Sequence, residues 1–225
     1  MLHRIVAAFA IVVVATPLGA TTPRENLVQV AFYPQDRTQA LVAIGQIEAD
    51  TRATLQRAPG DREARMVNAM ATSYRAKLAN NRADAIAARS MFEALVASNP
   101  RDPEAQVALG GWHVSSVVAL GGLIARGALG ARKSTGLEAL DAAVRLGGGR
   151  AAFSAIAGLL RLQLDGGDPR AAQLIEAGAC GATPTMLDRL MQRNAQRMAA
   201  ILKRGDKAQI RRAASQLMPL GQLNA

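Results

Sequence analysis

Side chains that could carry out chemistry are scarce in this sequence of 225 residues, which holds one Cys and two His. That supply excludes a disulfide framework and a Cys-rich zinc site, and leaves little for a histidine-based metal or catalytic cluster. Trp112-His113 is the conspicuous pair, because Trp is enriched at binding hot spots and His can titrate near neutrality. A single His with no obvious partner is more often a packed, hydrogen-bonded helix residue. Cys180, among Ala and Gly, is interpreted as a small packing residue.

A second candidate is the stretch 127–134, whose sequence GALGARKS superficially resembles a nucleotide phosphate loop. The phosphate loop requires Gly directly before Lys and a strand before the loop. Here Arg132 stands before Lys133, and the surrounding pattern is helical. We therefore expect a basic loop that faces solvent or an anionic partner, and we expect neither a cofactor nor a metal. The protein is predicted not to be an enzyme, unless the fold joins two carboxylates in a deep pocket.

Basic residues recur along the C-terminal region of a chain whose formal charge is +10. Arg189, Arg193 and Arg197 are four residues apart, which places them on one stripe of a helix. Further basic residues follow at Lys203, Arg204, Lys207, Arg211 and Arg212. The stripe is either a solvated face or a surface for an acidic protein or an anionic membrane, with Arg189, Arg193, Arg197 and Arg204 as its contacts. Nucleic acid is not expected as a partner, since only 3% of the residues are aromatic and available for base stacking.

The N-terminus has the pattern of a secretory signal peptide. A basic start, Met1–Arg4, precedes an apolar run, Ile5–Ala15, that is too short to span a bilayer. Pro17 breaks the run, and cleavage is expected after Ala20, so that the protein is exported to the periplasm. A retained N-terminal anchor is the alternative.

A second apolar stretch, Ala105–Ala125, contains no charged residue and is long enough for a membrane span. Its hydropathy is reduced by polar residues, among them Gln106 and His113, and by two pairs of glycines. We expect a helix buried inside the protein, with a membrane segment as the alternative.

The rest of the chain predicts helices separated by short breaks, so the fold class is all-α. Apolar residues at helical spacing mark the helices, and N-cap residues, Pro and Gly mark their ends. An irregular or extended lead is expected over Thr21–Tyr33, where 27–32 is the one segment with some strand character. In the first half, helices are expected from Pro34 to the break at 59–61, through Met66–Leu78, over Arg82–Ser98, and from Glu104 across the apolar stretch. In the second half, a helix is expected from a Thr135/Glu138 capping box to Leu146, followed by helices over 151–164 and 169–179. A longer helix from a Thr185/Asp188 capping box to 204 and a last one to about Met218 complete the chain.

A repeat pattern is present in these helices. The segment Ala88-x3-Phe92-x2-Leu95-x4-Pro100, followed nine residues later by Leu109-Gly110, resembles the tetratricopeptide repeat. The resemblance covers about 61–184, as three degenerate helix pairs, and implies a short solenoid of antiparallel helix pairs. The layout is then a signal peptide over 1–20, a lead and first helix over 21–60, the repeats over 61–184 and basic C-terminal capping helices over 185–225.

The resemblance also implies a binding surface on the concave face formed by the first helix of each pair. Apolar and polar side chains there would grip a protein or peptide, unless they are core residues or are covered by the C-terminal helices. They are Met66, Met70, Tyr74, Val107, Trp112, Val114, Leu159, Leu162 and Gln163. We expect a protein that binds a protein or peptide in the cell envelope, with a peripheral membrane-surface protein as the alternative. The sequence leaves the oligomeric state open.

Overall fold

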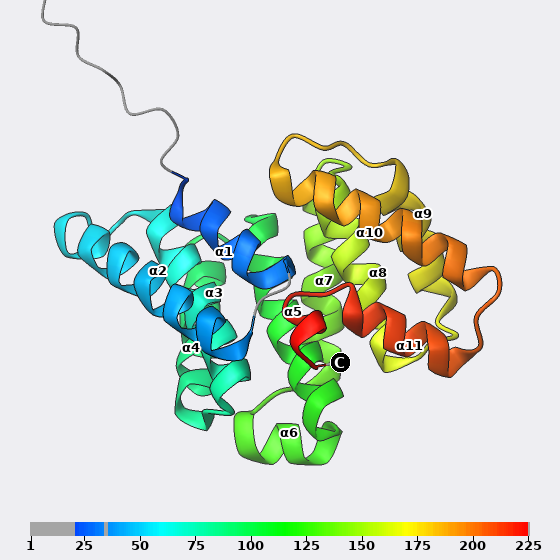
Figure 1. Cartoon of the computed structure of the whole chain (residues 1–225), viewed down its shortest axis with the longest axis horizontal. Coiled ribbons are helices and arrows are strands. Elements are labelled where there is room, and N and C mark those ends of the chain that lie inside the picture. Colours follow the sequence, from blue (N-terminus) through cyan, green and yellow to red (C-terminus); the bar gives the residue numbers. More distant parts are fainter. Residues whose placement is uncertain (1–20, 34–35, 225) are drawn as a thin grey trace, which may run out of the picture.

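The computed structural model describes residues 21–33 and 36–224. The proposed signal peptide, 1–20, lies outside the described residues, as does the proposed helix start at Pro34. Within the described part the chain is all-α, as predicted, with no β-strand (Figure 1). Its helices are α1 (Pro23–Phe32), α2 (Arg37–Arg57), α3 (Arg62–Ala79), α4 (Arg82–Ser98), α5 (Pro103–Leu120), α6 (Gly122–Leu129), α7 (Lys133–Leu146), α8 (Ala151–Leu164), α9 (Pro169–Cys180), α10 (Met186–Leu202), α11 (Lys207–Gln216) and a final 3-10 turn, η1 (Gly221–Asn224).

Local signals account for most helix ends. Asn81 accepts a hydrogen bond from the backbone N–H of Asp84 and starts α4 where the sequence predicts it. The capping box of Thr185 with Asp188 is confirmed at the start of α10. The bounds of α8 are also those predicted.

The expectation of an irregular or extended lead is wrong, because residues 23–32 form α1. Thr22 and Glu25 make a reciprocal capping box, and Pro23 occupies the first helical position. The segment T-P-R-E carries both signals in the sequence. They compete with a run of β-prone residues, Leu27–Phe32, and the local capping signal is the stronger of the two.

The long apolar helix is also shorter than predicted. It ends at Leu120, because Gly121 adopts a φ of +76° and turns the chain. Residues 122–129 then form α6, so the expected loop over 127–134 begins as helix. The next helix starts at Lys133, and the predicted capping box at Thr135 is therefore wrong.

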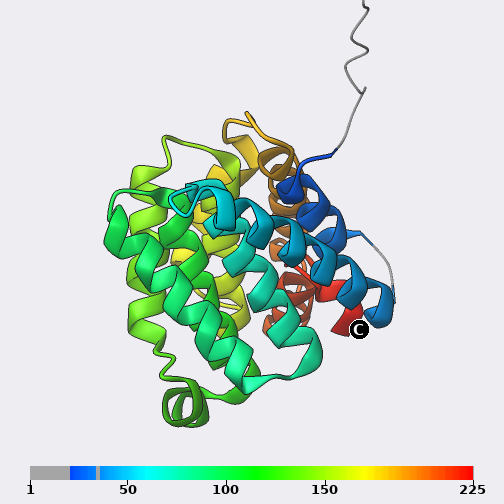
Figure 2. The ribbon, with the colours of Figure 1, turned by 90° about the vertical axis from the view of Figure 1, so that its left-hand side faces the viewer.

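Successive helices pack as antiparallel pairs that form a short solenoid (Figures 1 and 2). α2, α3, α4 and α5 follow one another at one end, and α5, α7, α8 and α9 continue the array. Small residues allow close approach: a Cβ on Gly110 of α5 would lie 2.8 Å from the carbonyl oxygen of Gly136 in α7. α8 is the most buried helix, since α5, α7, α9, α10 and α11 all pack against it.

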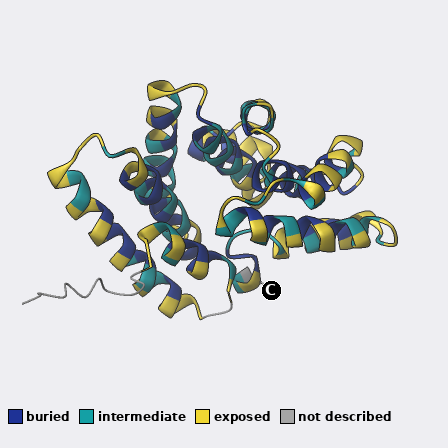
Figure 3. Cartoon of the chain, turned by 90° about the horizontal axis from the view of Figure 1, so that it is seen from above, coloured by how far each residue is buried: buried dark blue, intermediate teal, exposed yellow. Residues whose placement is uncertain are grey.

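The terminal helices pack on the two ends of this array. α1 packs on α2 and α3, and α10 and α11 pack on α8. The last turn returns to α1, where the N–H of Leu220 donates to the carbonyl oxygen of Ala31 at 2.6 Å. Lys77 of α3 donates to the carbonyl oxygen of Pro219 at 3.0 Å. Buried residues therefore line the facing sides of the helices, and exposed residues line their outer sides (Figure 3).

Candidate functional site

The predicted concave surface does not form an open groove. Met66, Trp112, Val114, Leu159 and Leu162 are each less than a tenth exposed. Leu159 and Leu162 contact the helices α10 and α11, within the same cluster as Met191, Met198 and Ile210. The interpretation of these residues as an accessible binding surface is therefore wrong. The terminal helices α10 and α11 cover Leu159 and Leu162, whereas neighbouring helices of the array itself bury Met66, Trp112 and Val114. Each of these apolar side chains gains free energy when it leaves water.

The other predicted groove residues are half-buried and contact core residues or the C-terminal helices. Met70 packs between two core clusters, Tyr74 packs against the α1–α2 side, and Val107 packs beside Leu140 and Leu160. Burial raises the pKa of the Tyr74 hydroxyl well above its usual range. Gln163 donates a hydrogen bond to the carbonyl oxygen of Ala214 in α11, at 3.3 Å.

Trp112 and His113 are packed residues of α5. Their rings meet edge to face with centroids 5.0 Å apart, and the guanidinium of Arg89 lies 5.9 Å from the Trp112 ring. His113 Nδ1 accepts the backbone N–H of Arg132 at 3.3 Å. Burial, with Arg89 and Arg132 nearby, lowers the pKa of His113 to about 4. His113 is thus a neutral hydrogen-bond acceptor, and its partner is a backbone group that sequence spacing does not reveal. Cys180 is exposed at the end of α9, so its interpretation as a packing residue is wrong.

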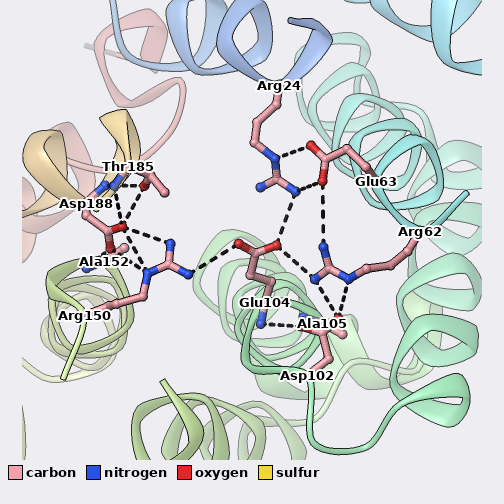
Figure 4. Close-up of polar contacts among 10 residues, drawn as sticks. All are labelled: Arg24, Arg62, Glu63, Asp102, Glu104, Ala105, Arg150, Ala152, Thr185 and Asp188. Carbon is pink, nitrogen blue, oxygen red and sulfur yellow. Dashed lines mark hydrogen bonds and ion pairs between the residues drawn. The ribbon is translucent and has the colours of Figure 1, made fainter. Parts of the chain in front are cut away.

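A cavity of about 460 Å³, which we call the arginine cleft, lies at the meeting point of several helix starts. The starts of five helices, α1, α3, α5, α8 and α10, meet around it, as Figure 4 shows in part. Its lining is Thr22, Arg24, Glu25, Val28, Arg62, Glu63, Glu104, Arg150, Pro184, Thr185, Met186, Leu187 and Arg189. Helix N-termini carry partial positive charge, which explains why carboxylates occupy the first turns here.

Glu104 is the centre of the ion-pair network in the cleft (Figure 4). Its carboxylate accepts from Arg62 at 2.9 Å and from Arg24 at 3.3 Å, and Arg150 lies 3.7 Å away. These three arginines come from the start of α3, from α1 and from the residue that precedes α8. The pKa of Arg24 is raised, because its bonds to Glu63 and Glu104 outweigh the effect of burial. The network therefore ties the N-terminal helices to the C-terminal half of the array.

Asp188 extends this network into α10. The carboxylate is fully buried and accepts from Arg150 at 2.9 Å, from the Thr185 hydroxyl at 2.7 Å and from the backbone N–H of Ala152 at 3.1 Å. Burial by itself would raise the pKa of Asp188, but these hydrogen bonds lower it overall. The buried charge is thus fully partnered, which is the condition under which a protein tolerates one.

The chemistry available in the arginine cleft is the recognition of charge. Arg24, Arg62 and Arg150 are each held by carboxylates, whereas Arg189 at the edge is exposed and has no ion-pair partner among the described residues. An incoming anion would compete with Glu104 for three guanidinium groups. In the described part of the chain, no three His, Cys, Asp or Glu side chains lie where they could hold a metal ion.

The basic stripe of α10 borders a second hollow, a cavity of about 290 Å³ that we call the α10 groove. All four arginines predicted as anionic contacts, Arg189, Arg193, Arg197 and Arg204, are exposed. Arg193 and Arg197 line the groove together with Phe32, Tyr33, Leu190, Asn194, Gln216, Leu217, Met218 and Gln222. Neither arginine has an ion-pair partner among the described residues. The stripe alone was predictable, but apart from Leu190 the apolar residues beside it come from the end of α1 and from the segment after α11.

Sequence reasoning missed an apolar surface at the bend between α5 and α6. Val118, Leu120, Leu123 and Ile124 are exposed, Leu123 by 90%, and we call these four residues the α5–α6 tip. Its signal in the sequence is the run VALGGLI, which interrupts a helix with two glycines but contains no polar side chain. Among the described helices, none is by itself long and apolar enough to cross a membrane. α5 and α6 reach that length together, but they are bent by 120°.

Comparison of the chain with protein-family models, with curated proteins and with solved structures finds no match. The features of this molecule that bear on function are therefore the arginine cleft, the α10 groove and the α5–α6 tip.

Proposed function

We propose that this protein is exported and binds a segment of a partner protein in the cell envelope, on a paired-helix array similar to tetratricopeptide repeats. The observation that carries the proposal is the α10 groove, where two unpaired arginines, Arg193 and Arg197, stand beside apolar side chains. Unpaired guanidinium groups beside an apolar hollow suit a ligand with carboxylates next to apolar side chains, because Arg binds carboxylates through two parallel hydrogen bonds.

The spacing of the arginines specifies the shape of this ligand. Arg189, Arg193 and Arg197 each lie four residues apart in α10, so their helix positions are separated by about 6 Å along the axis. Alternate residues of an extended peptide are separated by about 6.6 Å. An extended segment with acidic residues at alternate positions therefore matches the stripe, and apolar side chains between them would enter the groove beside Phe32 and Met218.

A peptide-binding measurement tests the proposal. A fluorescently labelled peptide of alternating Glu and Leu should bind the protein, and the charge-reversed variant R193E/R197E should bind it at least about tenfold more weakly. The control R211E/R212E changes the net charge equally at exposed positions of α11 and should bind normally. Equal loss in both variants would show a general charge effect and would refute the groove.

Site-specific photo-crosslinking in cells tests whether a partner protein occupies the groove in the envelope. A photoreactive residue at Tyr33, which lines the groove, should form an adduct with a protein of the envelope, whereas the same residue at Val42, which is 70% exposed elsewhere, should not. The adduct should disappear in R193E/R197E. Export is tested in the same cells, since the periplasmic form should begin at Thr21.

The alternative function is docking on a membrane surface through the basic C-terminal helix. The observation that favours it is the exposure of Arg189, Arg193, Arg197 and Arg204. Near an anionic bilayer each such charge contributes about 1 kcal/mol. Sedimentation with anionic vesicles that is lost at high salt and in R193E/R197E would support this function over peptide binding.

A further inference from the structure

The α5–α6 tip is an apolar end of the molecule that nothing in the described residues covers. Leu123 is 90% exposed, Ile124 63%, Leu120 41% and Val118 38%. Figures 1 and 2 place α6 at one extreme of the molecule in two perpendicular views. A continuous run of exposed residues without one polar side chain, 118–124, is unusual on a surface and marks an interaction site.

Exposed basic residues lie on α6 and close to it. Arg126 is exposed on α6 itself, and exposed Arg82 donates to the carbonyl oxygen of Ala128 at 2.8 Å. Arg132 and Lys133, both exposed, follow α6. No carboxylate occurs in the sequence between Glu104 and Glu138. Glu138 is exposed on α7, and Asp84 near Arg82 is already bound by Arg75 at 2.9 Å.

The distance between the apolar residues of the α5–α6 tip and the basic residues near it fits the layers of a lipid bilayer. The backbone of Arg132 contacts His113, which lies seven residues before the end of α5. Seven residues of helix measure about 10 Å, so the basic residues after α6 are set back from Leu120 by that length. Interfacial helices bury their apolar side chains about 5–10 Å into the headgroup and acyl boundary, while their basic residues remain at the anionic headgroups.

The backbone of the tip is also compatible with lipid. The N–H of Gly121 donates to the carbonyl oxygen of Val117, and the N–H of Ala125 donates to the carbonyl oxygen of Gly121, both at 2.9 Å. The chain therefore turns from α5 into α6 while these backbone groups stay hydrogen-bonded, which lowers the free-energy cost of moving the backbone from water into lipid.

We propose that the α5–α6 tip inserts into the surface of an anionic phospholipid bilayer and holds the protein there as a peripheral membrane protein. Charge complementarity selects the lipid: the tip has basic neighbours and lacks nearby unpaired acids other than Glu138. This surface is separate from the α10 groove, so membrane binding and peptide binding can fail independently.

An engineered Trp tests insertion directly. Trp112 is the sole natural Trp and is buried, so L123W adds one exposed reporter. With vesicles that contain a quarter phosphatidylglycerol, the emission of L123W should shift to the blue and be quenched by brominated acyl chains. V42W, at a position 70% exposed on α2, is the matched control and should not shift. An unchanged L123W spectrum, or an equal shift in V42W, would overturn the proposal.

Vesicle sedimentation tests the two parts of the surface. L123D/I124D should partition about tenfold or more weakly than the natural chain, since two apolar side chains lose their burial. R126Q/K133Q should lose roughly fivefold for each charge removed, on anionic vesicles alone. Equal binding to pure phosphatidylcholine vesicles would contradict selection by charge.

Two further measurements distinguish membrane insertion from unfolding and from self-association. The urea midpoint of L123D/I124D should equal that of the natural chain, because both side chains are mostly in solvent. Concentration-dependent self-association without lipid that disappears in L123D/I124D would show that the tip contacts a second copy of this chain, and would overturn the membrane proposal.

Discussion

The pH dependence of stability is the sharpest prediction, because it comes from one buried side chain. His113 is 4% exposed and has a pKa lowered to about 4 by burial and by the neighbouring charges of Arg89 and Arg132. In the unfolded chain its pKa is about 6.5. Between these values the unfolded state binds a proton that the folded state does not, so the free energy of unfolding must fall as the pH decreases.

The size of the effect follows from the two pKa values. Relative to about pH 7.5, the free energy of unfolding should be lower by about 2 kcal/mol at about pH 5 and by about 3 kcal/mol at about pH 4. Protonation also removes the acceptor at Nδ1 that binds the backbone N–H of Arg132. The carboxylates of Asp84 and Asp188 have pKa values below their usual range, so their stabilisation is lost at lower pH.

Urea unfolding followed by circular dichroism provides the assay, with H113Q as the control. Gln retains a hydrogen-bond acceptor but does not titrate, so the slope between about pH 7 and pH 5 should vanish. The other histidine, His3, belongs to the proposed signal peptide, and the cleavage that we propose after Ala20 would remove it. An unchanged slope in H113Q, or a His113 that titrates near its ordinary pKa by NMR, would refute the reasoning.

The remaining predictions concern stability. G45A should stabilise the protein by about 0.5–1 kcal/mol, since a Cβ on Gly45 of α2 meets no atom within 4 Å. G110A should destabilise it by about 1–3 kcal/mol, since its Cβ would lie 2.8 Å from a backbone oxygen of α7; urea titrations that rank the two in the opposite order would contradict the packing. D188N should cost about 2 kcal/mol or more in thermal unfolding, because it breaks a buried pair with Arg150. D206N is the control, because Asp206 is an exposed N-cap where Asn is equally suitable, and its melting temperature should change little. A similar loss of stability in both variants would show that the buried pair of Asp188 with Arg150 is not the cause.

Short-range patterns allowed most of the fold to be predicted. The bounds of α4 and α8, the capping box of α10 and the all-α class follow from cap residues, breaks and apolar spacing within one or two turns. The errors in helix bounds arose where two such short-range signals disagreed. At Thr22 a capping box outweighed β-prone residues, and at Gly121 a positive φ ended a helix that apolar character would have continued.

The candidate sites depended on contacts between distant residues. The spacing of Arg193 and Arg197 was visible in the sequence, but apart from Leu190 the apolar side chains beside them come from the end of α1 and from the chain after α11. Likewise Glu104 meets Arg24 and Arg150 across 80 and 46 residues of chain. No periodicity encodes these distances, because they depend on how whole helices pack.

The sequence by itself determined where helices form, since hydrogen bonds, caps and side-chain periodicity act within a few residues. Only the tertiary structure decided which faces stay in water. It buried Leu159 beneath α10 and α11, buried Met66 among α3, α4 and α5, and left Leu123 exposed, although all three are apolar residues in helical segments. Burial depends on which other elements reach a given face, and that is a property of the whole packed array.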